Sequence, residues 1–118
     1  MSFDLYNYRA ICVGVYDGDS ITLDIDLGYN IWMRNQKIRM LGINTPEIRG
    51  EERPDGLAAR DYLRDLILDK EVMLKSYKDR SGKYGRWLGT ILTKDEDGYW
   101  LNVNQHLLAE GHAKVYYP

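Results

Sequence analysis

Three short stretches of the chain gather side chains that can bind a cation or a phosphate. The first reads YDGDS and places Asp17 and Asp19 on either side of a glycine. In the strand that follows, Ile21, Leu23, Ile25 and Leu27 alternate with Ser20, Thr22, Asp24 and Asp26, which predicts that the apolar set faces the core and the polar set faces solvent. Asp19 shares its parity with the apolar set, so its carboxylate is expected to face the interior. A carboxylate there is costly unless a cation or hydrogen bonds compensate it. The alternative is an ordinary β-turn with two exposed carboxylates.

The second stretch reads IRMLGINTPE, and Arg39 interrupts its apolar run. A buried arginine nearly always pairs with an anion. That anion is either a carboxylate of the chain, from Asp19 or Glu47, or a phosphate, which a guanidinium binds through two parallel hydrogen bonds. The run ends in amide, carbonyl and carboxylate oxygens from Asn44, Thr45 and Glu47, and such donors suit hard cations such as Ca²⁺. Taken alone, the segment is a plain turn.

The third stretch reads KDRSGKYGRWLG and is basic. Four cations, Lys78, Arg80, Lys83 and Arg86, surround a Ser-Gly turn, and Tyr84 lies between them. A basic loop with an aromatic residue can hold a phosphate and stack a base. The alternative is a solvated hairpin whose charges have no particular partner.

The elements that position these stretches follow from the hydrophobic pattern. The predicted order is two strands within 8–28, a strand over 31–43, a helix over 54–70, strands over 71–77 and 86–93, a turn at Asp97–Gly98, a helix over 101–111 and an extended tail. Asp55 is expected to cap the first helix, after Pro54, and Gly111 to end the second. About five short strands with an inserted helix predict a mainly β, α+β fold. The architecture expected is a five-stranded Greek-key barrel of the oligonucleotide-binding (OB) type, with two α-helices.

Length and composition bound the class of protein. The 118 residues are expected to form a single domain over 1–118, and 44% apolar with 29% charged residues is typical of a globular chain. The net charge of −2 argues against a surface that binds nucleic acid everywhere, but it allows a local basic site. Cys12 is the only cysteine, and its apolar neighbours predict a buried thiol. With no membrane-length apolar run and no leader-like segment, a cytoplasmic location without membrane contact is expected.

The order of the motifs resembles the staphylococcal nuclease-like (thermonuclease) family. Asp-Gly-Asp is followed by Arg-x4-Asn-Thr-Pro-Glu and then by Lys-Tyr-Gly-Arg, and the tail VNQHLLAEGHAKVYY is similar to the family's second helix and following strand. The resemblance runs from about Cys12 to Tyr117. It implies a five-stranded OB barrel and an endonuclease-type hydrolase that cleaves phosphodiesters of DNA and RNA with one Ca²⁺ ion. Single-stranded or locally melted DNA, and RNA, are the expected partners.

The same resemblance assigns roles by position. Two arginines would clamp the scissile phosphate and a glutamate would position or deprotonate the attacking water: Arg39, Arg86 and Glu47. An aspartate, an amide oxygen and a backbone carbonyl would hold the metal, with a second aspartate behind them: Asp19, Asn44, Thr45 and Asp17. Three residues would contact the terminal phosphate or the base: Lys83, Tyr84 and Tyr117.

The chain departs from the family pattern in two places. Asn44 stands where well-known members carry a second metal-binding aspartate, and an amide brings no charge, so weaker Ca²⁺ binding is expected. The chain stops at Pro118, where a third, C-terminal helix follows in well-known members. Without that helix, either the barrel is less stable or the exposed surface pairs with another copy of the chain, which would make a homo-oligomer.

Two functions compete on these residues. The first is a metal-dependent nuclease, and the second is a catalytically silent OB-fold domain that binds nucleic acid, like the degenerate nuclease domains of Tudor-containing proteins. Silent domains typically lose the arginines or the glutamate, whereas this chain keeps Arg39, Glu47 and Arg86. Asn44 is the one feature that favours the silent domain. A protein-interaction barrel would leave the two arginines unexplained.

Overall fold

The structure is a computed structural model that describes residues 6–81 and 86–116, without the side chains of 78–81. Strands make up most of it, with two α-helices and one 3-10 turn. In chain order the elements are β1 (Asn7–Asp17), β2 (Ser20–Gly28), β3 (Ile31–Met40), β4 (Ile43–Asn44), η1 (Gly50–Glu52), α1 (Arg53–Ile67), β5 (Glu71–Ser81), β6 (Trp87–Lys94), β7 (Trp100–Asn102), α2 (Val103–Ala109) and β8 (Lys114–Val115).

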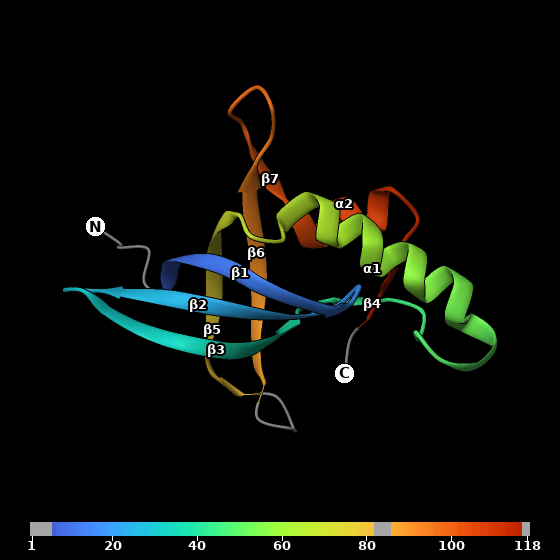
Figure 1. The fold of residues 1–118 in the computed structure, drawn as a ribbon, viewed down its shortest axis with the longest axis horizontal. Coiled ribbons are helices and arrows are strands. Elements are labelled where there is room, and N and C mark those ends of the chain that lie inside the picture. The colour runs from blue at the N-terminus through green and yellow to red at the C-terminus, as the bar shows by residue number, and fades with distance from the viewer. Residues whose placement is uncertain (1–5, 82–85, 117–118) are drawn as a thin grey trace.

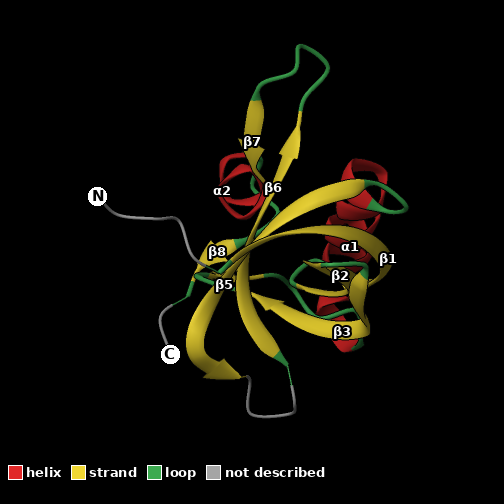
Figure 2. Ribbon diagram, turned by 90° about the vertical axis from the view of Figure 1, so that its left-hand side faces the viewer, coloured by secondary structure: helices red, strands yellow, loops and turns green. Residues whose placement is uncertain are grey.

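Five of the strands close into a barrel (Figures 1 and 2). The sheet runs β3-β2-β1-β5-β6-β7, and a parallel pairing between β3 and β6 closes the ring, with Ile38 opposite Trp87 and Met40 opposite Gly89. A Cβ added to Gly89 would lie 2.5 Å from Leu74 Cδ1, so a larger residue on the closing strand would have to displace this core side chain. The predicted mainly β fold, a five-stranded OB barrel with two helices, is confirmed.

The alternation along β2 places its apolar side chains in the core. Ile21, Leu23 and Ile25 are almost fully buried, as predicted, and Cys12 of β1 is completely buried beside them. Leu27 is 41% exposed, so the prediction that it faces the core is wrong. It lies at the end of β2, where a strand has few neighbours left to cover it.

Helix α1 adds its apolar stripe to the same core. Ala59, Leu63 and Ile67 are fully buried and share one face at helical spacing. The expectation that Asp55 caps this helix is wrong, because the 3-10 turn runs directly into it and Glu52 becomes the N-cap. Asp55 instead lies in the first turn, where a negative charge favours the helix dipole.

The C-terminal part is more divided than the sequence predicted. Helix α2 begins only at Val103, because 100–102 forms β7, and the side chain of Asn102 accepts a hydrogen bond from the Gln105 N–H at 3.1 Å as its cap. The extended tail then pairs as β8 with β4, which puts Lys114 opposite Asn44. No helix in the described ranges has the length and apolarity needed to cross a membrane.

Candidate functional site

The turn between β1 and β2 lies against the segment that follows β4. The Asp19 N–H donates to Asp17 Oδ1 at 3.0 Å, which holds the turn closed. A Cβ added to Gly18 would lie 2.7 Å from Thr45 Cγ2, so the Thr45 side chain packs against the Gly18 backbone and leaves no room for a side chain there. The sequence therefore needs a glycine between the two aspartates in order to bring them against Thr45.

The Asp19 carboxylate is the centre of this contact. It is 7% exposed, so the predicted inward orientation is confirmed. Its Oδ2 accepts a hydrogen bond from the Thr45 N–H at 3.0 Å, and its Oδ1 accepts one from the Ser20 hydroxyl at 3.2 Å. These bonds replace part of the hydration that the buried charge has lost.

Arg39 lies next to Asp19 at the end of β3. Its Nη1 is 3.5 Å from Asp19 Oδ2 and donates to the Met40 carbonyl at 3.0 Å, while its Nη2 donates to Asn44 Oδ1 at 3.3 Å. The Tyr116 ring lies 5.7 Å from the guanidinium carbon. Of the two carboxylates considered from the sequence, Asp19 is the one that pairs with Arg39. The guanidinium is thereby fixed in one plane.

Arg86 reaches the same carboxylate through a hydroxyl. Its Nη1 donates to Ser20 Oγ at 3.2 Å, and that hydroxyl in turn donates to Asp19 Oδ1. Two guanidinium groups that are distant in the sequence therefore converge on Asp19, one directly and one through Ser20. We call these joined residues the charged cluster: Asp19, Ser20, Arg39, Asn44, Thr45 and Arg86.

Asp17 lies at the edge of the charged cluster. The pKa of its carboxyl is raised to about 6, first by burial and then by the hydrogen bond and negative charge of Asp19. Two carboxyl groups this close repel each other when both are ionised, and a bound cation would relieve that repulsion.

The donors present fit a hard cation. Asp19 supplies a carboxylate, Asn44 an amide oxygen and Thr45 a carbonyl, and these are oxygen ligands. Within the part of the chain that the structure describes, the buried Thr45 hydroxyl has no hydrogen-bond partner. Across the same residues no three His, Cys, Asp or Glu side chains converge on one point.

Glu47 stands apart from the charged cluster. Its side chain is exposed, and its backbone N–H donates to Glu52 Oε2 at 2.8 Å. Helix α1 fixes its backbone, because a Cβ on Gly56 would collide with the Glu47 carbonyl. The Glu47 carboxylate is therefore carried by a loop whose backbone is fixed, two residues after Thr45. The remaining candidates, Lys83, Tyr84 and Tyr117, lie outside the described residues.

Two residues of the site were missed from the sequence. Ser20 was placed on the solvent face, yet its hydroxyl joins Arg86 to Asp19. Its signal was its position directly after Asp-Gly-Asp, at the first residue of a strand. Tyr116 stacks on Arg39, while the resemblance pointed to the neighbouring tyrosine. No signal in the sequence marked it. Tyr116 reaches Arg39 because the tail pairs with β4, and a two-residue strand is too short to show a hydrophobic pattern.

Comparison with known proteins gives consistent results. The family model described as staphylococcal nuclease homologue matches residues 37–118, which is more than half of the chain. A thermonuclease of Staphylococcus intermedius is 30% identical, over 99% of this chain and 66% of its own length. A thermonuclease of Staphylococcus hyicus is 31% identical, over 90% of this chain and 59% of its own length.

A third relative comes from an archaeon. It is an uncharacterized protein of Methanocaldococcus jannaschii, 27% identical over 93% of this chain and 60% of its own length. The chain thus spans between 59% and 66% of the length of these three curated relatives.

Proposed function

The chain belongs to the staphylococcal nuclease homologue family, and we propose that it is a Ca²⁺-dependent nuclease that hydrolyses phosphodiester bonds of DNA, RNA or both. The observation that carries this proposal is the convergence of Arg39 and Arg86 on one buried carboxylate, Asp19. Relatives named thermonuclease support the same class of reaction.

The two arginines would bind the phosphate. A phosphodiester is anionic and gains charge as water attacks, so fixed cations stabilise the transition state more than the ground state. Arg39 is suited to this role because its guanidinium is held by Met40, Asn44 and Asp19 before any substrate arrives. A planar fork held in this way needs little reorganisation when it binds two phosphate oxygens.

Glu47 would orient the water. A general base must lie within hydrogen-bond reach of its water, and an exposed carboxylate on a fixed loop meets that need once substrate covers it. Its backbone is fixed by Glu52 and by the close approach of Gly56. The proton taken from the water would pass to the Glu47 carboxylate as the water oxygen bonds to phosphorus. The P–O bond on the opposite side would break, and the leaving oxygen would take a proton from solvent.

A Ca²⁺ ion would be held by Asp19, Asn44 and Thr45, with Asp17 behind them. When bound, such an ion supplies a Lewis acid that offsets the negative charge of the phosphate. Asn44 brings an oxygen without a charge, and ligand charge sets affinity for this ion. We therefore expect weak binding, with activity that rises over a high range of Ca²⁺ concentration.

A silent nucleic-acid-binding barrel is the second candidate, and one contact favours it. The Asn44 amide oxygen already accepts a hydrogen bond from Arg39 Nη2 at 3.3 Å. An oxygen used in this way has less capacity to ligate a cation. In a silent domain the same arginines would bind the backbone phosphates of a strand without cleaving it.

Cleavage assays on single-stranded DNA and RNA separate the two candidates. We expect the wild type to cut with Ca²⁺ and not with chelator, and Arg39→Ala to cut about 10²- to 10³-fold more slowly. Arg34→Ala is the matched control, because Arg34 lies on the same strand and pairs with Asp24 at 3.1 Å, outside the charged cluster. Asn44→Asp should lower the Ca²⁺ concentration needed. A wild type that binds the strand but never cuts it, at any metal concentration, would establish the silent barrel.

A further inference from the structure

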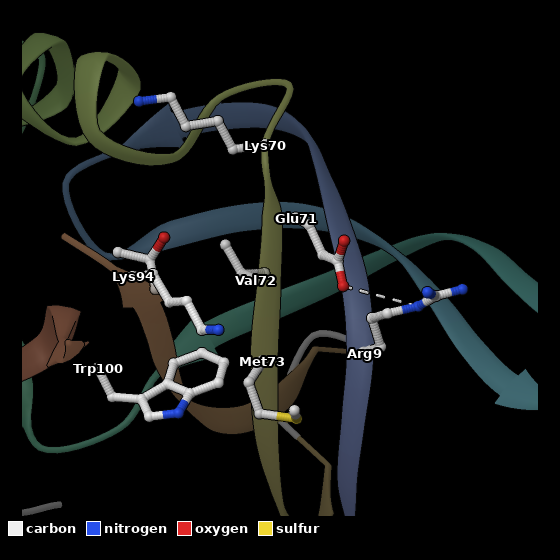
Figure 3. A pocket seen from close by; sticks show the side chains of 8 residues that line it. Arg9, Lys70, Glu71, Val72, Met73, Lys94 and Trp100 are labelled. Carbon is white, nitrogen blue, oxygen red and sulfur yellow. Dashed lines mark ion pairs between the residues drawn. The ribbon is translucent and has the colours of Figure 1, made fainter. Parts of the chain in front are cut away.

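The barrel is hollowed on its outside where β5 and β6 separate. Their pairing ends at Met73 and Leu92, after which β5 continues against β1 while β6 continues against β7. Between them lies a hollow of about 460 Å³ (Figure 3), a size at which small-molecule sites are common. We call it the indole hollow, and the residues that matter in it are Arg9, Lys70, Glu71, Met73, Lys94 and Trp100.

The indole hollow has two walls of different charge. On one wall, Arg9 is 2.8 Å from Asp26 and 3.8 Å from Glu71, so two carboxylates more than compensate its charge. On the other wall, Lys94 has no carboxylate within ion-pair distance among the side chains described. At the rim, the Lys70 ammonium donates to the Asp65 carbonyl at 3.2 Å, and its side chain points away from Lys94 and Trp100 (Figure 3).

The positive wall also carries an exposed aromatic ring. Trp100 is 56% exposed, and the Lys94 ammonium lies 5.2 Å from the centre of its ring (Figure 3). Met73 lies in the middle of the hollow, beside the indole. An exposed indole next to an uncompensated cation is a combination that stacks a base and binds the phosphate attached to it.

We propose that the indole hollow is an accessory subsite for one nucleotide of a single-stranded nucleic acid, with its base on Trp100 and its phosphate at Lys94. The inference rests on the proposed function only for the identity of the strand. The subsite adds affinity for long strands and takes no part in cleavage.

The subsite lies far from the charged cluster. Arg86 precedes the first residue of β6, and Lys94 is its last residue. At a rise of about 3.3 Å per residue, the two ends of this strand are about 23 Å apart. A nucleic acid bound at both places must therefore be longer than the few nucleotides that the charged cluster can hold. The subsite predicts an affinity that grows with length.

Binding of two fluorescent oligonucleotides in chelator tests this dependence. One has about 5 nucleotides and the other about 20, near the lower limit and above the upper limit of the range that a single OB barrel covers, about 4–16 nucleotides. We expect Trp100→Ala to lower the affinity for the longer oligonucleotide about tenfold and Lys94→Gln to lower it about fivefold. The affinity for the shorter oligonucleotide should not change. Lys94→Gln should also lower the slope of log affinity against log salt by about 0.7.

The chain provides a matched control pair elsewhere. Arg34 lies 4.8 Å from the centre of the Trp32 ring, so it repeats the cation and the indole outside the hollow. Trp32→Ala and Arg34→Gln should bind both strands as the wild type does. Melting curves establish that each variant is folded, and Trp100→Phe keeps a ring and should retain part of the affinity.

The outcomes separate this inference from the proposed function. If the wild type never cleaves nucleic acid but Trp100→Ala lowers the affinity for the longer oligonucleotide alone, the subsite is supported and the nuclease proposal is wrong. If the wild type cuts while Trp100→Ala and Lys94→Gln bind the longer strand normally, the subsite is wrong. It is also wrong if the wild type binds neither strand. Polyglutamate can also be added as a competitor of the longer oligonucleotide. If it displaces this oligonucleotide equally well from the wild type and from Trp100→Phe, the hollow binds negative charge without stacking a base, and the proposal is wrong.

Discussion

The two ends of β6 use positive charge in opposite ways. Near its start, Arg39 and Arg86 belong to the charged cluster, where contacts with the chain fix their guanidinium groups. At its end, Lys94 in the indole hollow contacts only the face of an exposed ring among the described side chains. A cation held before substrate arrives can stabilise a transition state, since no reorganisation is needed. A mobile cation can follow a flexible strand but adds affinity alone.

Exchanging the cation types at the two ends is the strongest test of this difference. Arg39→Lys keeps the charge but loses the planar fork and the bond to Asn44, so cleavage should fall about a hundredfold. Lys94→Arg keeps the charge at a place where no fork is required, so cleavage and affinity should change less than about twofold. Rates under excess substrate and affinities in chelator measure both. Equal losses of cleavage in Arg39→Lys and Lys94→Arg would show that the two ends of β6 do not use positive charge differently.

A buried amide supports the charged cluster and has no counterpart in the indole hollow. Asn104 accepts the Ile91 N–H at 3.0 Å and donates to the carbonyls of Leu41, at 2.9 Å, and Gly89, at 3.2 Å. It thereby ties α2 and β6 to the turn that follows Arg39.

Removing this amide should cost more than removing a cap of the same residue type. Asn104→Ala removes three hydrogen bonds and takes this partner from the Ile91 N–H and the Leu41 carbonyl, while the Gly89 carbonyl keeps its bond from the Leu41 N–H at 2.8 Å. It should lower the free energy of unfolding by about 2–4 kcal/mol. Asn102→Ala loses only the cap of α2, at about 1 kcal/mol. Urea unfolding of both variants gives the comparison. A smaller loss for Asn104→Ala than for Asn102→Ala would mean that the charged cluster does not depend on this support.

Sequence reasoning found the parts that a repeating pattern encodes. The alternation in β2 gave the barrel strand and the inward direction of Asp19, and the helical stripe of Ala59 and Leu63 gave α1. The apolar run around Arg39 also predicted an anionic partner for its guanidinium, and Asp19 was one of the two carboxylates considered. These features depend on neighbours a few residues away, which is the range over which sequence periods carry information.

What the sequence could not reveal depends on distant pairings. The β4–β8 pair has two residues on each side, too few for a pattern, and it is what brings Tyr116 to Arg39. The indole hollow exists because β5 and β6 choose different partners beyond Met73, and no local signal marks that divergence. Ser20 was assigned by parity to solvent, although strand ends no longer obey the alternation.

The close approach at the β1–β2 turn offers a smaller test of the rigid end. Gly18→Ala would place a Cβ within 2.7 Å of Thr45 Cγ2, and the resulting shift should cost about 1–3 kcal/mol of stability. Cleavage should fall as well, because Asp19 and the Thr45 N–H move apart. Thr45→Ser removes the nearest carbon and should restore part of both losses, which a double-mutant cycle measures. Independent, additive effects would show that the turn tolerates the extra atom.

A substitution in the barrel interior, between the two ends of β6, gives the smallest expected change in stability. It tests whether the barrel can be altered without affecting either end. Cys12 is fully buried there, and burial raises the pKa of its thiol from 9.0 to about 11. Above pH 9 the unfolded chain loses this proton while the folded chain keeps it, so stability should fall as pH rises towards 11. Between pH 9 and 10 the loss is about 1 kcal/mol. Cys12→Ala should remove this part of the pH dependence without changing the Arg39 or Trp100 phenotypes. Rapid alkylation of the native thiol at pH 8 would contradict the burial on which this prediction depends.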